Sequence, residues 1–130
     1  LLAQAIVEGC AVLLLASLVP GVIAAPGFVA ALAVTLVVAM LAHLALVAFE
    51  YLVMRSPTRH HQLAVHAIRR GPFAKLFWGG AIGTAAMSAI VGALLSGMPA
   101  AVALAAGLAL AGSFAWEYIW VEAGQSVPLS

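Results

Sequence analysis

Charged residues are scarce in this sequence. Only 7% of the 130 residues are charged, five Lys or Arg and four Asp or Glu, and the net charge of +1 gives no indication of nucleic-acid binding. The sequence has one cysteine, which excludes a disulfide framework and a paired-cysteine metal site. Because Cys10 stands in an apolar run, we expect it to be a small helix-packing residue.

Apolar residues, by contrast, dominate the chain. They make up 66% of it, against roughly 45–50% in an ordinary soluble domain, and the mean hydropathy is +1.21. Such a chain is expected to have lipid as its main solvent. Four segments are long enough to span a bilayer core, which needs about 20 helical residues. These predicted spans run over about 1–24, 28–54, 73–95 and 100–121.

Two short uncharged links, Ala24–Phe28 and Ser96–Ala100, combine Gly with Pro and are predicted to be turns. Links this short make the helices they join antiparallel. The predicted fold class is therefore an all-α integral membrane protein, an antiparallel four-transmembrane-helix bundle that forms a single membrane domain over 1–130.

Every Lys and Arg lies between positions 55 and 75, so the positive-inside rule predicts that this loop is cytoplasmic. With four spans, both ends of the chain would face the cytoplasm too. Apolar residues recur at helical spacing within the loop and predict a short amphipathic helix at the membrane interface, ended by Gly71-Pro72. They are Leu63, Ala64, Ala67 and Ile68.

Two patterns concern helix packing. The third span carries a small residue at every fourth position, which predicts close approach of a neighbouring helix; these are Gly80, Thr84, Ser88 and Gly92. Aromatic residues gather near the basic loop on the third and fourth spans and predict an interfacial aromatic belt. They are Phe77, Trp78, Trp116, Tyr118 and Trp120.

Ionisable residues inside spans are costly, roughly 2.5–3.5 kcal/mol each, and raise the question of function. His43 and Glu50 are seven residues apart and share a helix face. Glu50, Glu117 and Glu8 are expected at one depth near the cytoplasmic side, with Arg70 and Lys75 close by. We consider Glu50, His43, Glu8 and Glu117 proton-route candidates of a cytoplasmic half-channel. The alternative, ion pairs and hydrogen bonds that hold the bundle together, is favoured because carboxylates at this level can reach water.

Metal and catalytic sites are not predicted. His60, His61 and His66 have no cysteine or acidic partner in their loop, so they do not form a metal-ligand pattern. A haem held between helices normally needs histidines on facing spans, and His43 is the only one within a span. We expect that this chain binds no cofactor of its own.

Three stretches resemble the NrfD family, the polysulfide-reductase-type membrane subunits of multi-subunit oxidoreductases. They are "RRGPFAKLFWGGAIG" (Arg69–Gly83), "WEYIWVEAGQSVPLS" (Trp116–Ser130) and "QAIVEGCAVLLL" (Gln4–Leu15). The resemblance extends over nearly the whole chain, but family members usually have eight or more spans in two four-helix bundles. We therefore expect that this chain is the C-terminal half of a longer protein.

The resemblance implies a membrane anchor subunit of a quinone-linked respiratory oxidoreductase in the bacterial inner membrane. The implied partners are an iron–sulfur protein, a catalytic subunit that commonly carries molybdopterin, lipid and the helices of an N-terminal half. The family's quinone pocket is usually placed in the first bundle, so no residue of this chain is assigned as a quinone ligand. The alternative function is a small four-helix proton-coupled transporter of the multidrug type, with Glu8 as its coupling carboxylate.

Overall fold

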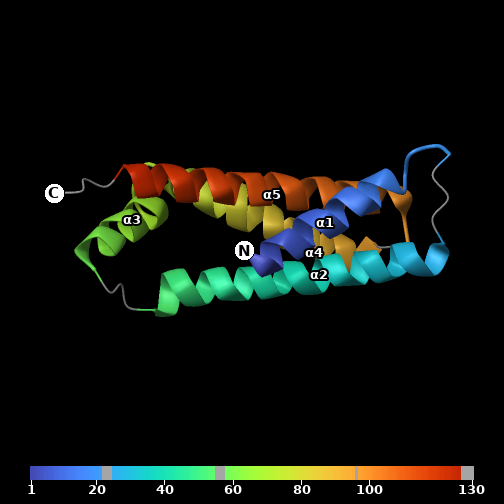
Figure 1. Cartoon of the computed structure of the whole chain (residues 1–130), viewed down its shortest axis with the longest axis horizontal. Helices are drawn as coiled ribbons and strands as arrows, with labels where there is room; N and C mark the ends of the chain where they lie inside the picture. The colour runs from blue at the N-terminus through green and yellow to red at the C-terminus, as the bar shows by residue number, and fades with distance from the viewer. Residues whose placement is uncertain (22–24, 55–57, 96, 127–130) are drawn as a thin grey trace.

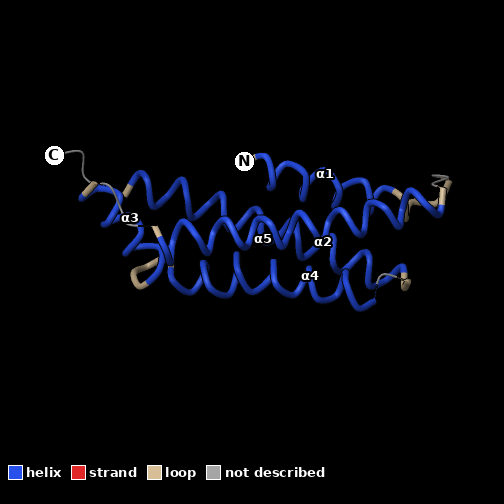
Figure 2. The backbone as a smooth tube through the Cα atoms, turned by 90° about the horizontal axis from the view of Figure 1, so that it is seen from below, coloured by secondary structure: helices blue, strands red, loops and turns tan. Residues whose placement is uncertain are grey.

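The computed structural model describes residues 1–21, 25–54, 58–95 and 97–126, and this part of the chain contains helices and turns but no strand (Figure 2). The helices are α1 (Leu2–Ala16), α2 (Pro26–Ala48), the π-helix η1 (Phe49–Val53), α3 (Arg59–Arg69), the π-helix η2 (Leu76–Gly83), α4 (Thr84–Leu95) and α5 (Pro99–Gln125). The all-α prediction is confirmed.

Four helical rods pack around one axis. Helix α1 contacts α2 and α5, and α4 contacts the same two helices from the other side. Figure 1 shows that α2 and α5 run toward the end of the bundle that carries α3, whereas α1 and α4 run away from it. Helices α1 and α4 are therefore each antiparallel to both α2 and α5. The π-helices extend these rods, since η1 continues α2 and η2 leads directly into α4.

Three helical segments are long and apolar enough to cross a membrane. They are Gly27–Val53, Leu76–Leu95 and Pro99–Gln125, with mean hydropathies of 2.5, 1.5 and 1.6. Helix α1 has 15 residues and a length of about 22 Å, shorter than the roughly 30 Å of a bilayer core. The structure thus supports three candidate spans, and a membrane crossing by α1 stays a prediction.

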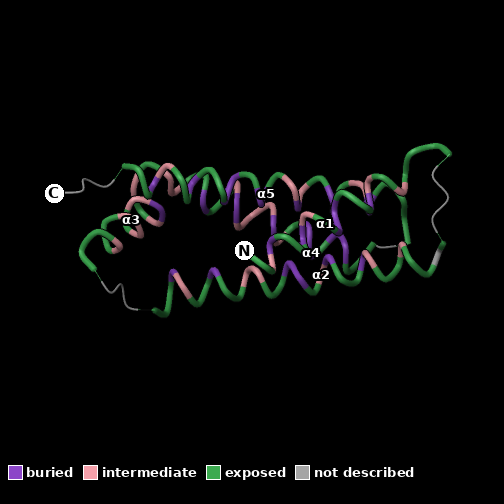
Figure 3. Tube along the Cα trace, in the orientation of Figure 1, coloured by how far each residue is buried: buried purple, intermediate pink, exposed green. Residues whose placement is uncertain are grey.

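The outer surface of the bundle is apolar. Figure 3 shows exposed residues along the outer side of α2, and they include Val34, Val38 and Leu41. Large apolar side chains exposed in this number are what lipid solvates.

The start of the bundle differs from the prediction. Helix α1 ends at Ala16, although the first span was predicted to reach residue 24. Pro20 disfavours helical geometry at the preceding residue, and Gly21 takes a φ of 90°, which glycine tolerates best. Helix α2 then begins at Pro26, inside the predicted turn, because proline is well tolerated in the first turn of a helix. Four predicted features lie outside the described residues: 22–24 of the first span, Arg55, Ser96 and Ser130.

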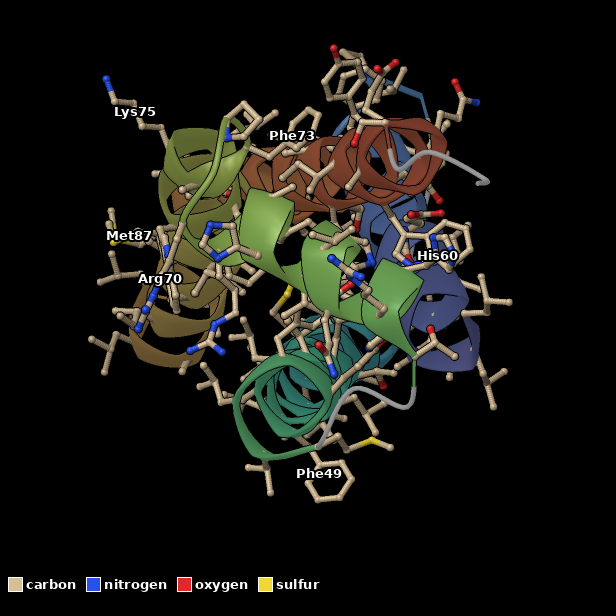
Figure 4. All side chains as sticks on the ribbon, turned by 90° about the vertical axis from the view of Figure 1, so that its left-hand side faces the viewer. Phe49, His60, Arg70, Phe73, Lys75 and Met87 are labelled. Carbon is tan, nitrogen blue, oxygen red and sulfur yellow. The ribbon has the colours of Figure 1, made fainter. Side chains whose placement is uncertain are left out.

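The predicted amphipathic helix exists as α3. The side chain of Thr58 caps its N-terminus by accepting a hydrogen bond from the backbone N–H of His61 at 3.2 Å. Its apolar residue Ile68 is buried, and α3 lies across the end of the bundle (Figure 4). The turn after α3 needs a glycine, because a Cβ on Gly71 would lie 2.7 Å from the Cα of Ala67. The location of α3 at a membrane interface stays a prediction.

The predicted small-residue face lies in the bundle interior. Ser88 is buried, and its hydroxyl donates a hydrogen bond to the backbone oxygen of Ala105 on α5 at 2.7 Å. At the start of α4, Thr84 faces Gly112 of α5. A Cβ added to Gly112 would lie 2.7 Å from the Thr84 hydroxyl oxygen. Small residues therefore let α4 and α5 approach closely, as the spacing predicted.

Candidate functional site

Three hydrogen-bonded side chains near the start of α1, those of Gln4, Glu8 and Glu117, join α1 to α5. The Gln4 side-chain amide donates from Nε2 to Oε1 of Glu8, one turn farther along α1, at 3.2 Å. The same nitrogen donates to Oε1 of Glu117 on α5 at 2.9 Å. Gln4 is only 5% exposed, so these bonds satisfy both of its amide hydrogens where water has little access.

This arrangement follows from the helical register of the sequence. Gln4 and Glu8 are four residues apart, which places them on one face of α1. Ionised carboxylates only accept hydrogen bonds, so one neutral amide with two N–H groups can bridge two of them. The amide therefore holds two acidic groups together without adding a charge of its own.

A cleft of about 790 Å³ lies next to this group, and Gln4, His43, Glu50 and Glu117 are among the residues that line it. Leu1 also lines the cleft, and Figure 1 shows that α1 begins partway along the bundle. His43 and Glu50 line the same cleft, which agrees with the predicted shared face.

Glu50 also lines a second hollow. This hollow measures about 460 Å³ and lies between α3, α5 and η1, with His61, Tyr51 and Gln125 among its lining residues. Because Glu50 and His61 line both spaces, Glu50 stands between the cleft and the end of the bundle that carries α3.

An aromatic cluster forms one wall of the site. The ring of Trp116 contacts His43 edge-on, with centroids 5.9 Å apart, and contacts Tyr51 in the same manner at 5.3 Å. Phe77 packs on Tyr51 at 5.7 Å and on Trp116 at 6.1 Å. Such contacts add roughly 0.5–1.5 kcal/mol per pair beyond area burial, so they fix the rings in place.

This cluster corrects part of the predicted aromatic belt. Phe77 and Trp116 are buried in the core and do not lie on the surface, because their rings fill the space between η1, η2 and α5. Trp78, Tyr118 and Trp120 are exposed, as a belt requires. The indole of Trp78 also donates a hydrogen bond from Nε1 to the backbone oxygen of Arg69, which ties η2 to the end of α3.

Both π-helices contribute to this wall, since Tyr51 belongs to η1 and Phe77 to η2. In η1 the backbone N–H of Met54 donates to the oxygen of Phe49, five residues earlier, at 2.9 Å. Longer runs of π-helix are rare, and π-bulges are frequent at functional sites. The sequence analysis did not predict them, because apolar periodicity does not distinguish π-helix from α-helix over five to eight residues.

The structure brings three of the four candidate residues to the cleft: His43, Glu50 and Glu117. Glu8 does not line the cleft, but the Gln4 amide donates hydrogen bonds to both Glu8 and Glu117. Arg70 and Lys75 are exposed, and Figure 4 shows Lys75 pointing away from the bundle. Within the described ranges, no group of three or more His, Cys, Asp or Glu is placed to hold a metal ion. The roles of these residues stay predictions.

Gln4 is the site residue that sequence reasoning missed. A signal was present, because an amide in the first turn of an apolar helix, four residues before an acid, favours a hydrogen bond between them. The contact with Glu117 had no such signal, since 113 residues separate the two side chains.

Comparison with known proteins places the chain in a family. The family model described as "Polysulphide reductase, NrfD" matches residues 1–128. The chain belongs to the NrfD family. No curated protein and no solved structure matches it. Together with the three apolar helices, membership of NrfD identifies a multi-pass membrane protein that serves as a membrane subunit of an oxidoreductase.

Proposed function

We propose that this NrfD chain is the membrane anchor of a quinone-linked respiratory complex in the bacterial inner membrane. It supports electron exchange between the quinone pool and an iron–sulfur subunit, and a separate catalytic subunit, commonly a molybdopterin enzyme, completes the complex. The chain itself forms the C-terminal half of a longer protein with a further helix bundle. The observation that carries this proposal is the family match over residues 1–128.

The second element of the proposal is a proton route through the polar site. Glu50 lines both the cleft and the hollow beside α3, and α3 belongs to the basic loop that the positive-inside rule assigns to the cytoplasm. His43 continues the route inward along the same cleft. A carboxylate followed by an imidazole can load and pass protons, and quinone chemistry consumes or releases them.

The variant Glu50→Gln tests this route. Glutamine keeps the size of the side chain and most of its hydrogen bonding, but it cannot titrate. We expect Glu50→Gln to assemble normally and to slow quinone-linked turnover by about 10²-fold or more, the usual range for loss of a proton-transfer group. The measurement is turnover of the purified complex with a soluble quinol, alongside its subunit composition.

Glu50→Leu is the matched comparison, because it also removes the polar contacts. If Glu50 only holds the bundle together, Glu50→Gln turns over at the wild-type rate while Glu50→Leu impairs assembly. Normal turnover of Glu50→Gln would exclude the proton route. Co-purification without any iron–sulfur subunit would contradict the anchor function itself.

The multidrug-type transporter is the weaker alternative. It relies on Glu8 as a coupling carboxylate, whereas Glu8 accepts a hydrogen bond from Gln4 and does not line the cleft. The family match favours the anchor subunit.

A further inference from the structure

Two exposed cations lie on one side of the bundle, at the end that carries α3. Arg70 caps the C-terminus of α3, Lys75 directly precedes η2, and both side chains are exposed. Viewed along the bundle, Figure 4 shows them on the same side as Met87 of α4, whereas His60 lies on the opposite side. No Asp or Glu occurs between positions 58 and 95, so this stretch of the chain has no carboxylate of its own to neutralise the two cations.

An apolar surface continues from these cations along the rod formed by η2 and α4. Trp78 and Met87 are 46% and 52% exposed, and the exposed Ile90 and Leu94 extend the surface at helical spacing from Met87. Met87 lies 12 residues after Lys75, about 18 Å farther along a helix axis. This distance is close to half of the roughly 30 Å of a bilayer core, so the surface from Lys75 to Met87 has the depth of one lipid leaflet.

The indole of Trp78 is held beside the cations. Its Nε1 donates a hydrogen bond at 3.2 Å to the backbone oxygen of Arg69, the residue before Arg70. Its ring also packs edge-on against the buried ring of Phe77, with centroids 4.8 Å apart. Tryptophan is enriched where lipid head groups meet acyl chains, because the indole has an apolar body and one polar N–H. The exposed ring therefore marks the level at which a head group would be followed by its chains.

Charge and apolar surface together select the occupant of this side. The negative charge of a phosphate is matched by the guanidinium of Arg70, which can donate to two of its oxygens, and by the ammonium of Lys75. Each Lys or Arg near a membrane surface favours anionic lipid by about fivefold. An acidic protein surface would also match the two charges, but it would leave the apolar surface of Trp78 and Met87 without a partner. A phospholipid matches both.

We propose that Arg70 and Lys75 bind the head group of an anionic phospholipid whose acyl chains lie along Trp78 and Met87. The phosphate accepts hydrogen bonds from both cations. A zwitterionic phospholipid binds more weakly, because the positive group of its own head is repelled by the two cations. This proposal requires that the chain crosses a membrane, and it does not depend on the proposed electron exchange or proton route.

The test is photolabelling of the purified complex in vesicles of phosphatidylethanolamine. One probe is a trace of phosphatidylglycerol with a diazirine on an acyl chain, and the other is phosphatidylcholine with the same chain. We expect the anionic probe to label the peptides that contain Trp78 or Met87 at least about fivefold more strongly, as mapped by mass spectrometry. Equal labelling by the two probes would overturn the proposal. So would the absence of label from both probes, which would mean that a protein subunit covers this side.

A matched pair of variants shows whether Arg70 itself carries the preference. Arg70 and Arg59 are exposed at opposite ends of α3, and Arg59 adjoins His60 on the other side of the bundle. We expect Arg70→Gln to lower the excess of the anionic probe by about fivefold and Arg59→Gln to leave it unchanged. Arg70→Lys keeps the charge and should retain most of the excess, which separates loss of binding from damage to the fold. Equal effects of Arg70→Gln and Arg59→Gln would contradict the site, because the excess would then reflect only the overall charge of the loop.

Discussion

Replacing Gln4 by leucine removes the side-chain amide that joins α1 to α5. Leucine has a similar volume and suits a buried position, so the perturbation is mainly the loss of two hydrogen bonds, at 3.2 Å to Glu8 and 2.9 Å to Glu117. Hydrogen bonds between membrane helices contribute about 0.6 kcal/mol on average and up to about 1.7 kcal/mol. We therefore expect Gln4→Leu to lower the free energy of unfolding by about 1–3 kcal/mol.

The assay is reversible unfolding in mixed micelles by titration with a denaturing detergent. A double-mutant cycle with Glu117→Leu isolates the interhelical bond, and its coupling energy should be about 0.6–1.7 kcal/mol. Gln62→Leu is the control, because Gln62 is exposed on α3, and it should change stability by less than about 0.5 kcal/mol. If the effects of Gln4→Leu and Glu117→Leu add to within about 0.3 kcal/mol, the bridge does not stabilise the bundle and the reasoning fails.

Two further outcomes are expected. Gly112→Ala should lower the free energy of unfolding by about 1–3 kcal/mol, because the added Cβ would lie 2.7 Å from the Thr84 hydroxyl oxygen. Gly107→Ala is the control on the same helix and should be neutral or stabilising, because its added Cβ has nothing within 4 Å. Equal losses of stability in both variants would contradict the close packing of α4 and α5. In the variant His60→Cys, a membrane-impermeant maleimide should label the exposed position 60 from the cytoplasmic side only. The buried Cys10 should not react with the maleimide. Labelling from the opposite side would reverse the predicted orientation.

Local sequence patterns predicted most of the helices. The second and fourth spans were predicted at 28–54 and 100–121, and the structure has Gly27–Val53 and Pro99–Gln125. Apolar runs bounded by Gly and Pro define helices well, because both signals act within a few residues. The same signals misplaced the end of α1, since the first span was predicted over about 1–24 and so included Pro20 and Gly21. In the structure they follow a helix that has already ended at Ala16.

The polar site was predictable only in part, for a physical reason. His43 and Glu50 share a face of one helix, so spacing alone indicated their common cleft. The bridge from Gln4 to Glu117 depends on how α1 and α5 are rotated against each other, which no single-helix pattern encodes. The burial of Trp116 and Phe77 depends in the same way on the packing of η1 and η2 around them.

The bridge from Gln4 to Glu117 connects these observations, because both of its residues also line the cleft. Gln4 thus closes the α1 side of the cleft and fixes the carboxylate of Glu117 there, while Glu50 stands at the side that opens toward α3. The two acids therefore have different surroundings: Glu117 lies beside a buried amide, whereas Glu50 lines two open spaces. Under the proposed proton route, Glu50 is the acid that would connect those spaces.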